Sequence, residues 1–296
     1  MSGEPQCLWE IGAQLGEGPV WSADEQAVWF VDIKGCRVHR YNVATAQGRS
    51  WDAPSNPGFL APIEGGGWLI GLKTGLYRFD PASGVFSHFA PIEAHLGDNR
   101  LNDGVVDPLG RLWFGSMHDA ETDATGALYR MSPDGTATAQ DSDYIITNGP
   151  AFSPDGAVLY HTDTLKRVIY AFDVDTNGAL GGRRVFARID KPGAYPDGPA
   201  VDAEGCVWTG LFGGWGLNRY APTGELLEFV AFPCANVTKP AFGGPDLTTL
   251  YATTAWKGLT PEQRVEQPLA GGLFSLDVAT AGQPQALLKL DPGARQ

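Results

Sequence analysis

The chain lacks the features that mark several common functional classes. No apolar run approaches the roughly 20 residues that a membrane-spanning helix needs, and no basic segment followed by an apolar one opens the sequence. Its 21 Lys and Arg residues stand against 34 Asp and Glu, giving a formal net charge of −13, and no basic stripe is present. Because binding to phosphate backbones depends on clustered basic side chains, we expect neither a nucleic-acid nor a membrane partner.

Cysteine and charge are also sparse. The four cysteines, Cys7, Cys36, Cys206 and Cys234, form no Cys-x-x-Cys pair and no regular framework. Without a leader segment, this pattern predicts a cytoplasmic protein with free thiols. Charged residues make up only 19% of the chain, which argues against long solvated helices or a disordered tail.

Turn-forming residues are abundant and evenly spread. The sequence contains 39 Gly and 22 Pro between short apolar runs, and 43% of its residues are hydrophobic. Distributed turn formers between short apolar segments favour an all-β protein with many tight turns.

One sequence pattern recurs six times, with strand-like runs separated by turns. The copies begin at Glu17, Phe59, Asp103, Asn148, Asp197 and Lys239. The starts are spaced from 42 (59 − 17) to 49 (197 − 148) residues, which suits four short strands per unit. We therefore predict an all-β, six-bladed β-propeller that forms a single domain over residues 1–296. A strand near "CLWEIG" is expected to complete the last blade and close the ring.

The first residue of each copy should lie near the mouth of the central channel, where several oxygen-bearing side chains would meet. Carboxylates that share a poorly solvated site repel one another, and a divalent cation relieves that repulsion. Asp-Gly and Asn-Gly are also common turns, so turn formation explains any single copy. It explains Glu17 poorly, because Glu is a weak turn former. The pattern therefore favours a metal site in the channel, with Ca²⁺, Mg²⁺, Mn²⁺, Zn²⁺ or Fe²⁺ as candidate ions.

Four segments carry a resemblance to a known family. "LGEGPVW", "NRLNDGVVDPLGRLWFGSM", "TNGPAFSPDG" and "YPDGPAVDAEGCVW" occur in this order across nearly the whole chain. Together they resemble the regucalcin/gluconolactonase family of metal-dependent lactonases, and most closely the bacterial xylonolactonase-type enzymes.

The resemblance implies a set of site residues. Glu17, Asn148 and Asp197 would bind one divalent metal ion, and Asp197 would also act in catalysis. Arg100 and Asn102 would contact the substrate, and Asp103 would support the channel. His118 or Asp119 could supply a further substrate contact, and we assign Asp119. Lys239 could bind an anionic product or pair with a neighbouring carboxylate.

The implied function is hydrolysis of a sugar lactone, such as xylono-, arabinono- or gluconolactone, to its aldonic acid. We take a monomer as the default oligomeric state. Two alternatives stay open: a phosphotriesterase-like hydrolase and a non-enzymatic propeller that binds calcium or protein. No Gly-x-Ser-x-Gly elbow supports a serine esterase. We expect His161 to be a strand residue that is hydrogen-bonded within its blade, and Trp29, Trp113 and Trp208 to lie in the core.

Overall fold

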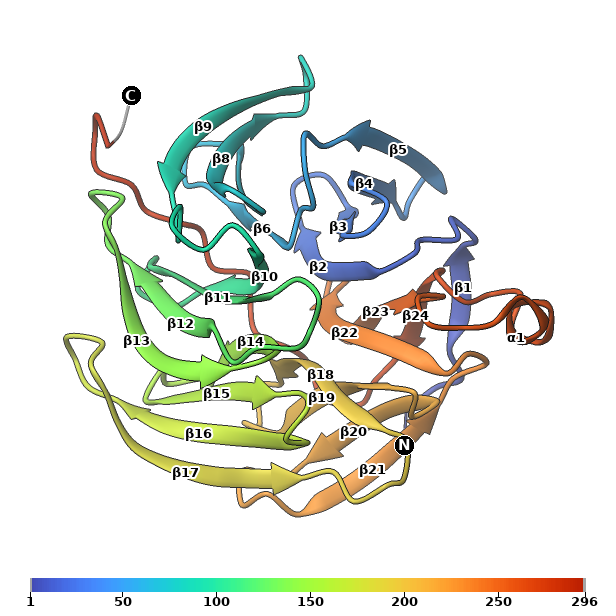
Figure 1. Ribbon diagram of the computed structural model, residues 1–296. Coiled ribbons are helices and arrows are strands. Elements are labelled where there is room, and N and C mark those ends of the chain that lie inside the picture. The colour runs from blue at the N-terminus through green and yellow to red at the C-terminus, as the bar shows by residue number, and fades with distance from the viewer. Residues whose placement is uncertain (1, 295–296) are drawn as a thin grey trace.

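Six four-stranded antiparallel sheets surround a central channel in the computed structural model, which describes residues 2–294 (Figure 1). Each predicted repeat forms one sheet, so the expected six-bladed β-propeller is confirmed. The first strand of every blade lies at the channel and the later strands lie progressively farther out (Figure 1).

The first three blades contain the strands β2 (Gly16–Ser22), β3 (Ala27–Asp32), β4 (Arg37–Asn42) and β5 (Gln47–Asp52); β6 (Phe59–Pro62), β7 (Trp68–Leu72), β8 (Gly75–Asp80) and β9 (Val85–Pro91); and β10 (Asn99–Val106), β11 (Leu112–His118), β12 (Gly126–Met131) and β13 (Ala137–Tyr144).

Blades four and five contain β14 (Thr147–Phe152), β15 (Val158–Asp163), β16 (Val168–Val174) and β17 (Leu180–Arg188); and β18 (Tyr195–Val201), β19 (Val207–Phe212), β20 (Gly216–Tyr220) and β21 (Leu226–Ala231). Blade six contains β22 (Asn236–Gly243), β23 (Thr249–Ala255) and β24 (Leu273–Asp277), with the short helix α1 (Pro261–Glu266) between its second and third strands. No helix in the described part of the chain has the length and hydropathy of a membrane span.

The ring closes through its N-terminal strand, as predicted. Strand β1 (Gln6–Trp9) pairs antiparallel with β24 and forms the outermost strand of blade six. One blade is thus built from both ends of the sequence. This pairing covers the edge of β24, which would otherwise present unpaired backbone groups.

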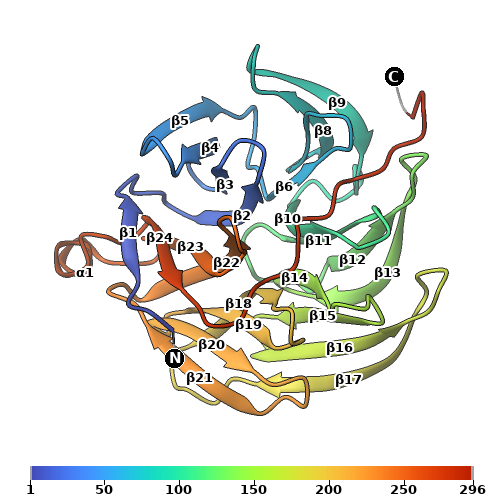
Figure 2. The same cartoon turned by 180° about the vertical axis from the view of Figure 1, so that it is seen from behind.

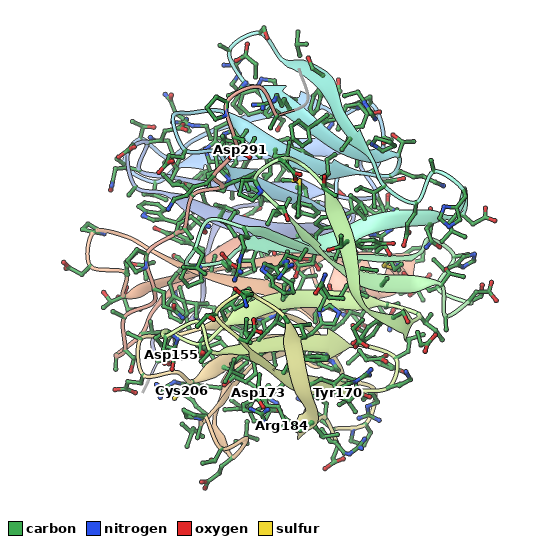
Figure 3. All side chains as sticks on the ribbon, turned by 90° about the vertical axis from the view of Figure 1, so that its left-hand side faces the viewer. Asp155, Tyr170, Asp173, Arg184, Cys206 and Asp291 are labelled. Carbon is green, nitrogen blue, oxygen red and sulfur yellow. The ribbon has the colours of Figure 1, made fainter. Side chains whose placement is uncertain are left out.

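The C-terminal segment crosses one end of the channel (Figure 2). It is pinned by bridges from Gly282 to Asp202 and from Leu288 to Ile63, and Leu288 is buried against the second and third blades. Asp155, Cys206 and Asp291 mark this side of the disc in Figure 3. A cavity of about 480 Å³ lies at this end, lined in part by proline rings of the inner strands.

Tryptophans at one repeat position fill the space between the blades. Trp29, Trp113 and Trp208 are at most 1% exposed, which confirms the predicted core positions. The indole Nε1 of Trp113 donates to Asp107 at 2.9 Å, and that of Trp208 donates to Asp202 at 3.0 Å. Each aspartate therefore ties the turn after an inner strand to the core of its blade.

Asp202 lies close to Glu204 and Cys206, a grouping of potential metal ligands. The oxygens of Asp202, however, already accept the amides of Glu204 and Cys206, the indole of Trp208 and two guanidinium nitrogens, Nε and Nη2, of Arg219. A carboxylate with this many donors has a structural role, and we assign it to the turn. All four cysteines are free, as expected. His161 lies in strand β15 as expected, but neither ring nitrogen has a hydrogen-bond partner among residues 2–294, so the prediction that it is hydrogen-bonded within the blade is wrong.

We predict that Asp202→Asn lowers the free energy of unfolding by about 2–4 kcal/mol, because a neutral amide leaves Arg219 without its buried counter-charge. Urea unfolding monitored by tryptophan fluorescence measures this change. Asp155→Asn, in the exposed equivalent turn of blade four, is the control and should cost less than about 1 kcal/mol. Equal costs in the two variants would contradict the assignment.

Candidate functional site at the channel mouth

Irregular pairing marks the inner strands where they approach the channel mouth. Strands β2, β10, β14, β18 and β22 each carry one extra residue opposite their partner strand, as a β-bulge does. Strand β6 pairs regularly and places the apolar Phe59 there. A bulge turns a side chain out of the alternating pattern, so polar groups can point into the channel.

The pairing register corrects the repeat alignment in blade three. Val20, Val105 and Ala200 pair with the repeat tryptophans, and the residues three positions earlier are Glu17, Asn102 and Asp197. Asn102, rather than Asp103, therefore occupies the position of Glu17 and Asp197. A register shift of one residue was invisible in the sequence because "NDG" offers two adjacent oxygen-bearing side chains. In blade six the bulge lies between Val237 and Pro240, so Thr238 rather than Lys239 occupies the same position.

The three predicted metal ligands are all buried. Glu17, Asn148 and Asp197 are 4%, 3% and 5% exposed. Glu17 Oε2 accepts the Gly18 amide at 3.0 Å, and Gly18 adopts a positive φ of 55° there. Asn148 Nδ2 donates to Thr164 Oγ1 at 2.9 Å, so its amide oxygen is held in the opposite direction. Asp197 Oδ1 is buried and has no hydrogen-bond partner among residues 2–294.

The two carboxyl groups of this set, those of Glu17 and Asp197, lie in an environment that disfavours negative charge. Burial raises the pKa of Glu17 to about 7, and repulsion from Asp103 adds to this while Lys239 opposes it. Burial also raises the pKa of Asp197 well above its usual range, and its contact with Glu17 contributes. Without a further positive charge, the pair therefore retains a proton near neutral pH.

These groups fit a divalent cation. The donor set consists of carboxylate and amide oxygens, which hard cations such as Ca²⁺, Mg²⁺ and Mn²⁺ prefer. The buried Asp197 Oδ1, which accepts no hydrogen bond from residues 2–294, and the two raised pKa values fit a positive charge at this point. A bound cation would satisfy both.

Asp103 and Lys239 form a buried ion pair between blades three and six. Lys239 Nζ lies 2.5 Å from Asp103 Oδ1, and the two side chains are 8% and 2% exposed. The carboxylate also accepts the amides of Gly104 and Gly149, each at 2.7 Å. Of the two alternatives left open for Lys239, the structure contains the ion pair with a carboxylate. Asp103 also holds the backbone beside Asn148.

Arg100 and Asn102 connect the oxygen cluster to the loops above it. Asn102 Nδ2 donates to Asn148 Oδ1 at 2.9 Å, and its Oδ1 accepts Arg100 Nη1 at 2.5 Å. Arg100 Nε donates in turn to Asp119 Oδ1 at 2.8 Å, and Arg100 is only 2% exposed. The polar atoms of Asn102 are therefore all engaged by the protein. Its direct contact with substrate, expected from the resemblance, stays a prediction.

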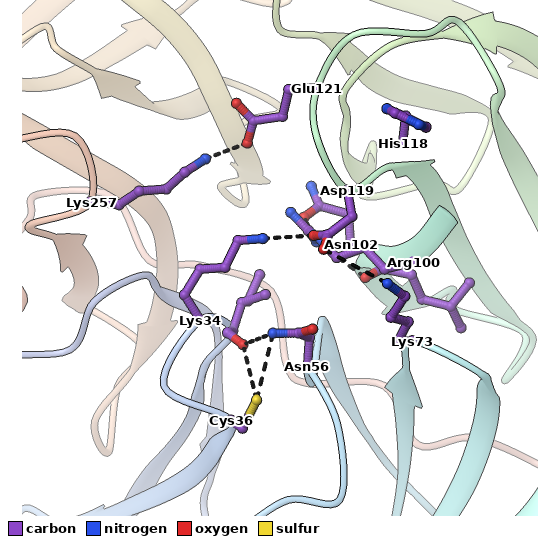
Figure 4. Close-up of polar contacts among 12 residues, drawn as sticks. Lys34, Cys36, Asn56, Lys73, Arg100, Asn102, His118, Asp119, Glu121 and Lys257 are labelled. Atoms are coloured by element: carbon purple, nitrogen blue, oxygen red, sulfur yellow. Dashed lines mark hydrogen bonds and ion pairs between the residues drawn. The ribbon is translucent and has the colours of Figure 1, made fainter. Parts of the chain in front are cut away.

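Asp119 begins a loop between β11 and β12 that reaches over the channel mouth (Figure 4). It also accepts Lys34 Nζ at 2.6 Å, whereas its neighbour His118 contacts Thr122. Two residues later in this loop, Glu121 forms an ion pair with Lys257. Of the two sequence alternatives, Asp119 is therefore the one connected to Arg100.

Three lysines at the mouth escaped the sequence analysis. Lys34, Lys73 and Lys257 follow the second strands of blades one, two and six, within two residues of the strand ends. Their common position after the second strand of a blade is the signal in the sequence that marks them.

The fold and the site together define a class of protein. It is a six-bladed β-propeller with a buried cluster of oxygen ligands at one mouth of its channel. The family model described as "SMP-30/Gluconolactonase/LRE-like region" matches residues 15–256, and the chain belongs to this family. The predicted family is thereby confirmed.

Individual relatives cover almost the entire chain. It is 33% identical over 283 residues to a 6-deoxy-6-sulfogluconolactonase of Pseudomonas putida, covering 95% of this chain and 97% of that one. It is 33% identical over 282 residues to regucalcin of Homo sapiens, covering 92% and 93%. The structure of a calcium-binding regucalcin of Agrobacterium tumefaciens is similar with a TM-score of 0.93 and 30% identity, covering 97% and 98%.

The raised pKa of Glu17 predicts a pH-dependent stability in metal-free protein. Folding raises this pKa from 4.5 to about 7, so its stabilising effect is complete below about pH 4.5 and is lost as pH rises through 7. Relative to Glu17→Gln, which cannot titrate, chelator-treated wild type should lose about 3 kcal/mol of unfolding free energy over this range. Urea unfolding of both proteins between pH 4.5 and 8 measures the difference. A pH-independent difference would contradict the electrostatic assignment.

The buried ion pair predicts strong coupling between its partners. Lys239→Met alone should cost about 3–5 kcal/mol, because it leaves Asp103 charged and unpaired. Adding Asp103→Asn should recover part of this loss, giving a coupling of about 1–3 kcal/mol in a double-mutant cycle. Additive effects of the two substitutions in urea unfolding would show that they do not interact.

Proposed function

We propose that this protein is a sugar lactonase that uses one divalent cation to hydrolyse an aldono-1,4- or 1,5-lactone to the aldonic acid. The observation that carries the proposal is the unpartnered Asp197 Oδ1, buried beside Glu17 and Asn148 at the channel mouth. Family membership and the gluconolactone-derivative substrate in the name of the P. putida relative support this reaction class. The calcium-binding A. tumefaciens relative supports a divalent cation.

Glu17, Asn148 and Asp197 are the proposed cation ligands. A cation held there would supply Lewis-acid stabilisation of the negative charge that develops on the lactone carbonyl oxygen. Glu17 is held by the Gly18 amide and Asn148 by Thr164 and Asn102, so both donors are oriented before substrate arrives. Preorganised donors of this kind need no rearrangement during the reaction.

Asp197 is the proposed general base. With Oδ1 facing the proposed cation, the other carboxylate oxygen of Asp197 would accept a proton from a water molecule as the water oxygen bonds to the acyl carbon of the lactone. The bond between the acyl carbon and the ring oxygen then breaks, and Asp197 returns the proton to that oxygen, which leaves as a hydroxyl group. The backbone carbonyl of Asp197 accepts Thr162 and Thr209, each at 3.2 Å, which fixes the residue at the mouth.

Arg100 is proposed to orient the substrate while Asn102 positions Asn148. The Nε and Nη1 groups of Arg100 are engaged by Asp119, Leu101 and Asn102, and no hydrogen bond of Nη2 is found within residues 2–294. That nitrogen could therefore donate to a sugar oxygen without breaking a protein contact. Asp119 keeps the guanidinium in place, and it remains the proposed further substrate contact.

We predict that Asp197→Asn lowers kcat/KM for the preferred lactone by roughly 10²–10⁴-fold, because it removes the proton acceptor. Acid release from xylono-, arabinono-, galactono- and gluconolactone would be followed on chelator-treated protein and after addition of Ca²⁺, Mg²⁺, Mn²⁺, Zn²⁺ or Fe²⁺. Activity should require an added ion, and the panel ranks substrates and ions together. Glu64→Gln, an exposed carboxylate in a turn of blade two, should retain wild-type activity.

Two results would overturn the proposal. Folded protein that accelerates no lactone with any ion would not be a lactonase, and a panel of phosphotriesters would then test the alternative hydrolase. Full activity in Asp197→Asn would exclude this residue as the base.

A further inference from the structure

We propose that the three mouth lysines, Lys34, Lys73 and Lys257, form a subsite for an anionic group on the substrate. This inference rests on the proposed lactonase function and specifies its substrate class: sugar lactones that carry an oxyanion, such as a phosphate or sulfonate, away from the lactone carbonyl.

The first observation is the placement of the lysines. Three of the seven lysines of the chain occur just after the second strands of blades six, one and two, which are consecutive around the ring. Figure 4 shows all three reaching toward the loop that contains Asp119 and Glu121. Lysines gathered from three blades on one half of the mouth create a local positive region in a protein whose formal net charge is −13.

The second observation is the local charge balance. Once the proposed divalent cation balances Glu17 and Asp197, Lys34, Lys73, Lys257 and Arg100 bring four positive charges against the two negative charges of Asp119 and Glu121, a difference of two (4 − 2). Lys73 makes the weakest ionic contact of the three lysines, because its Nζ lies 3.9 Å from Asp119 and its side chain is 34% exposed. A bound oxyanion would therefore neutralise an excess of positive charge that is already present at the mouth.

The third observation is the connection to the proposed reaction centre. Lys34 contacts Asp119, Asp119 contacts Arg100, and Arg100 leads through Asn102 to Asn148. The lysines thus form the layer of the mouth above the oxygen cluster.

Partial burial of the lysines strengthens their attraction for an anion. The side chains of Lys34 and Lys257 are 21% and 28% exposed, so an oxyanion between them would be screened less than one on the open surface. Charge-assisted hydrogen bonds of this kind are stronger than those to neutral hydroxyls. The neutral lactones of the sugar panel lack the group that would use them.

The test compares glucono-1,5-lactone with its 6-phosphate and 6-sulfo derivatives on the metal-loaded protein. Wild type should show kcat/KM at least about tenfold higher for an anionic lactone than for the neutral one. Lys73→Gln and Lys257→Gln should each reduce this ratio several-fold, and the double variant should bring it near one. The 6-phosphate and 6-sulfo arms show which oxyanion fits better.

Two controls separate a local subsite from general electrostatics. Lys289→Gln removes the same charge from the C-terminal segment at the opposite end of the channel and should leave the ratio unchanged. Isothermal titration of 6-phosphogluconate and gluconate provides a readout independent of turnover. The phosphorylated acid should bind wild type about tenfold more tightly, and this preference should vanish in the Lys73→Gln, Lys257→Gln double variant.

The outcomes separate this inference from the lactonase proposal. Equal hydrolysis and equal binding of neutral and anionic compounds would overturn the subsite while leaving the lactonase intact. Absence of all lactone hydrolysis would overturn the lactonase, and the titrations would still decide whether the lysines select an anion. Loss of preference in Lys289→Gln as well would assign the effect to overall charge and overturn the subsite.

Discussion

The ion pair between Asp103 and Lys239 is the contact on which the organisation of the channel depends. It joins the inner strands of blades three and six across the ring, in a place where neither charge reaches water freely. A buried charge without a partner is strongly destabilising, so each residue requires the other. Through the Gly149 amide, the same carboxylate holds the backbone next to Asn148. The oxygen cluster is therefore assembled on a cross-channel contact.

The bulges explain how a regular repeat can hold such different side chains. In an undistorted strand, successive residues alternate between the two faces of the blade. An extra residue in β10, β18 and β22 interrupts that alternation and frees polar residues such as Asn102, Asp197 and Lys239 from the core pattern. Strand β6 has no extra residue and contributes Phe59, which is fully buried. The polar side chains of the channel therefore occur on the strands that carry a bulge.

The repeats made the architecture predictable, because turn residues and apolar runs at a steady spacing leave few alternatives to a propeller. They also predicted that Glu17, Asn148 and Asp197 lie at one level of the channel. The register in blade three was not predictable, since Asn102 and Asp103 are adjacent and a bulge selects between them. The contacts of Lys34 and Lys257 with the loop of blade three join segments far apart in the chain. No local pattern encodes such contacts between loops.

The charged side chains of the channel form three groups at different levels, and each group has a different role. Asp103 and Lys239 neutralise each other, so this pair fixes geometry without attracting a ligand. Glu17 and Asp197 have a surplus of negative charge, which a cation can relieve. The lysines around Asp119 and Glu121 have a surplus of positive charge, which an anion can relieve. A molecule with a polarised carbonyl at one end and an oxyanion at the other would complement both surpluses at once, in a single orientation.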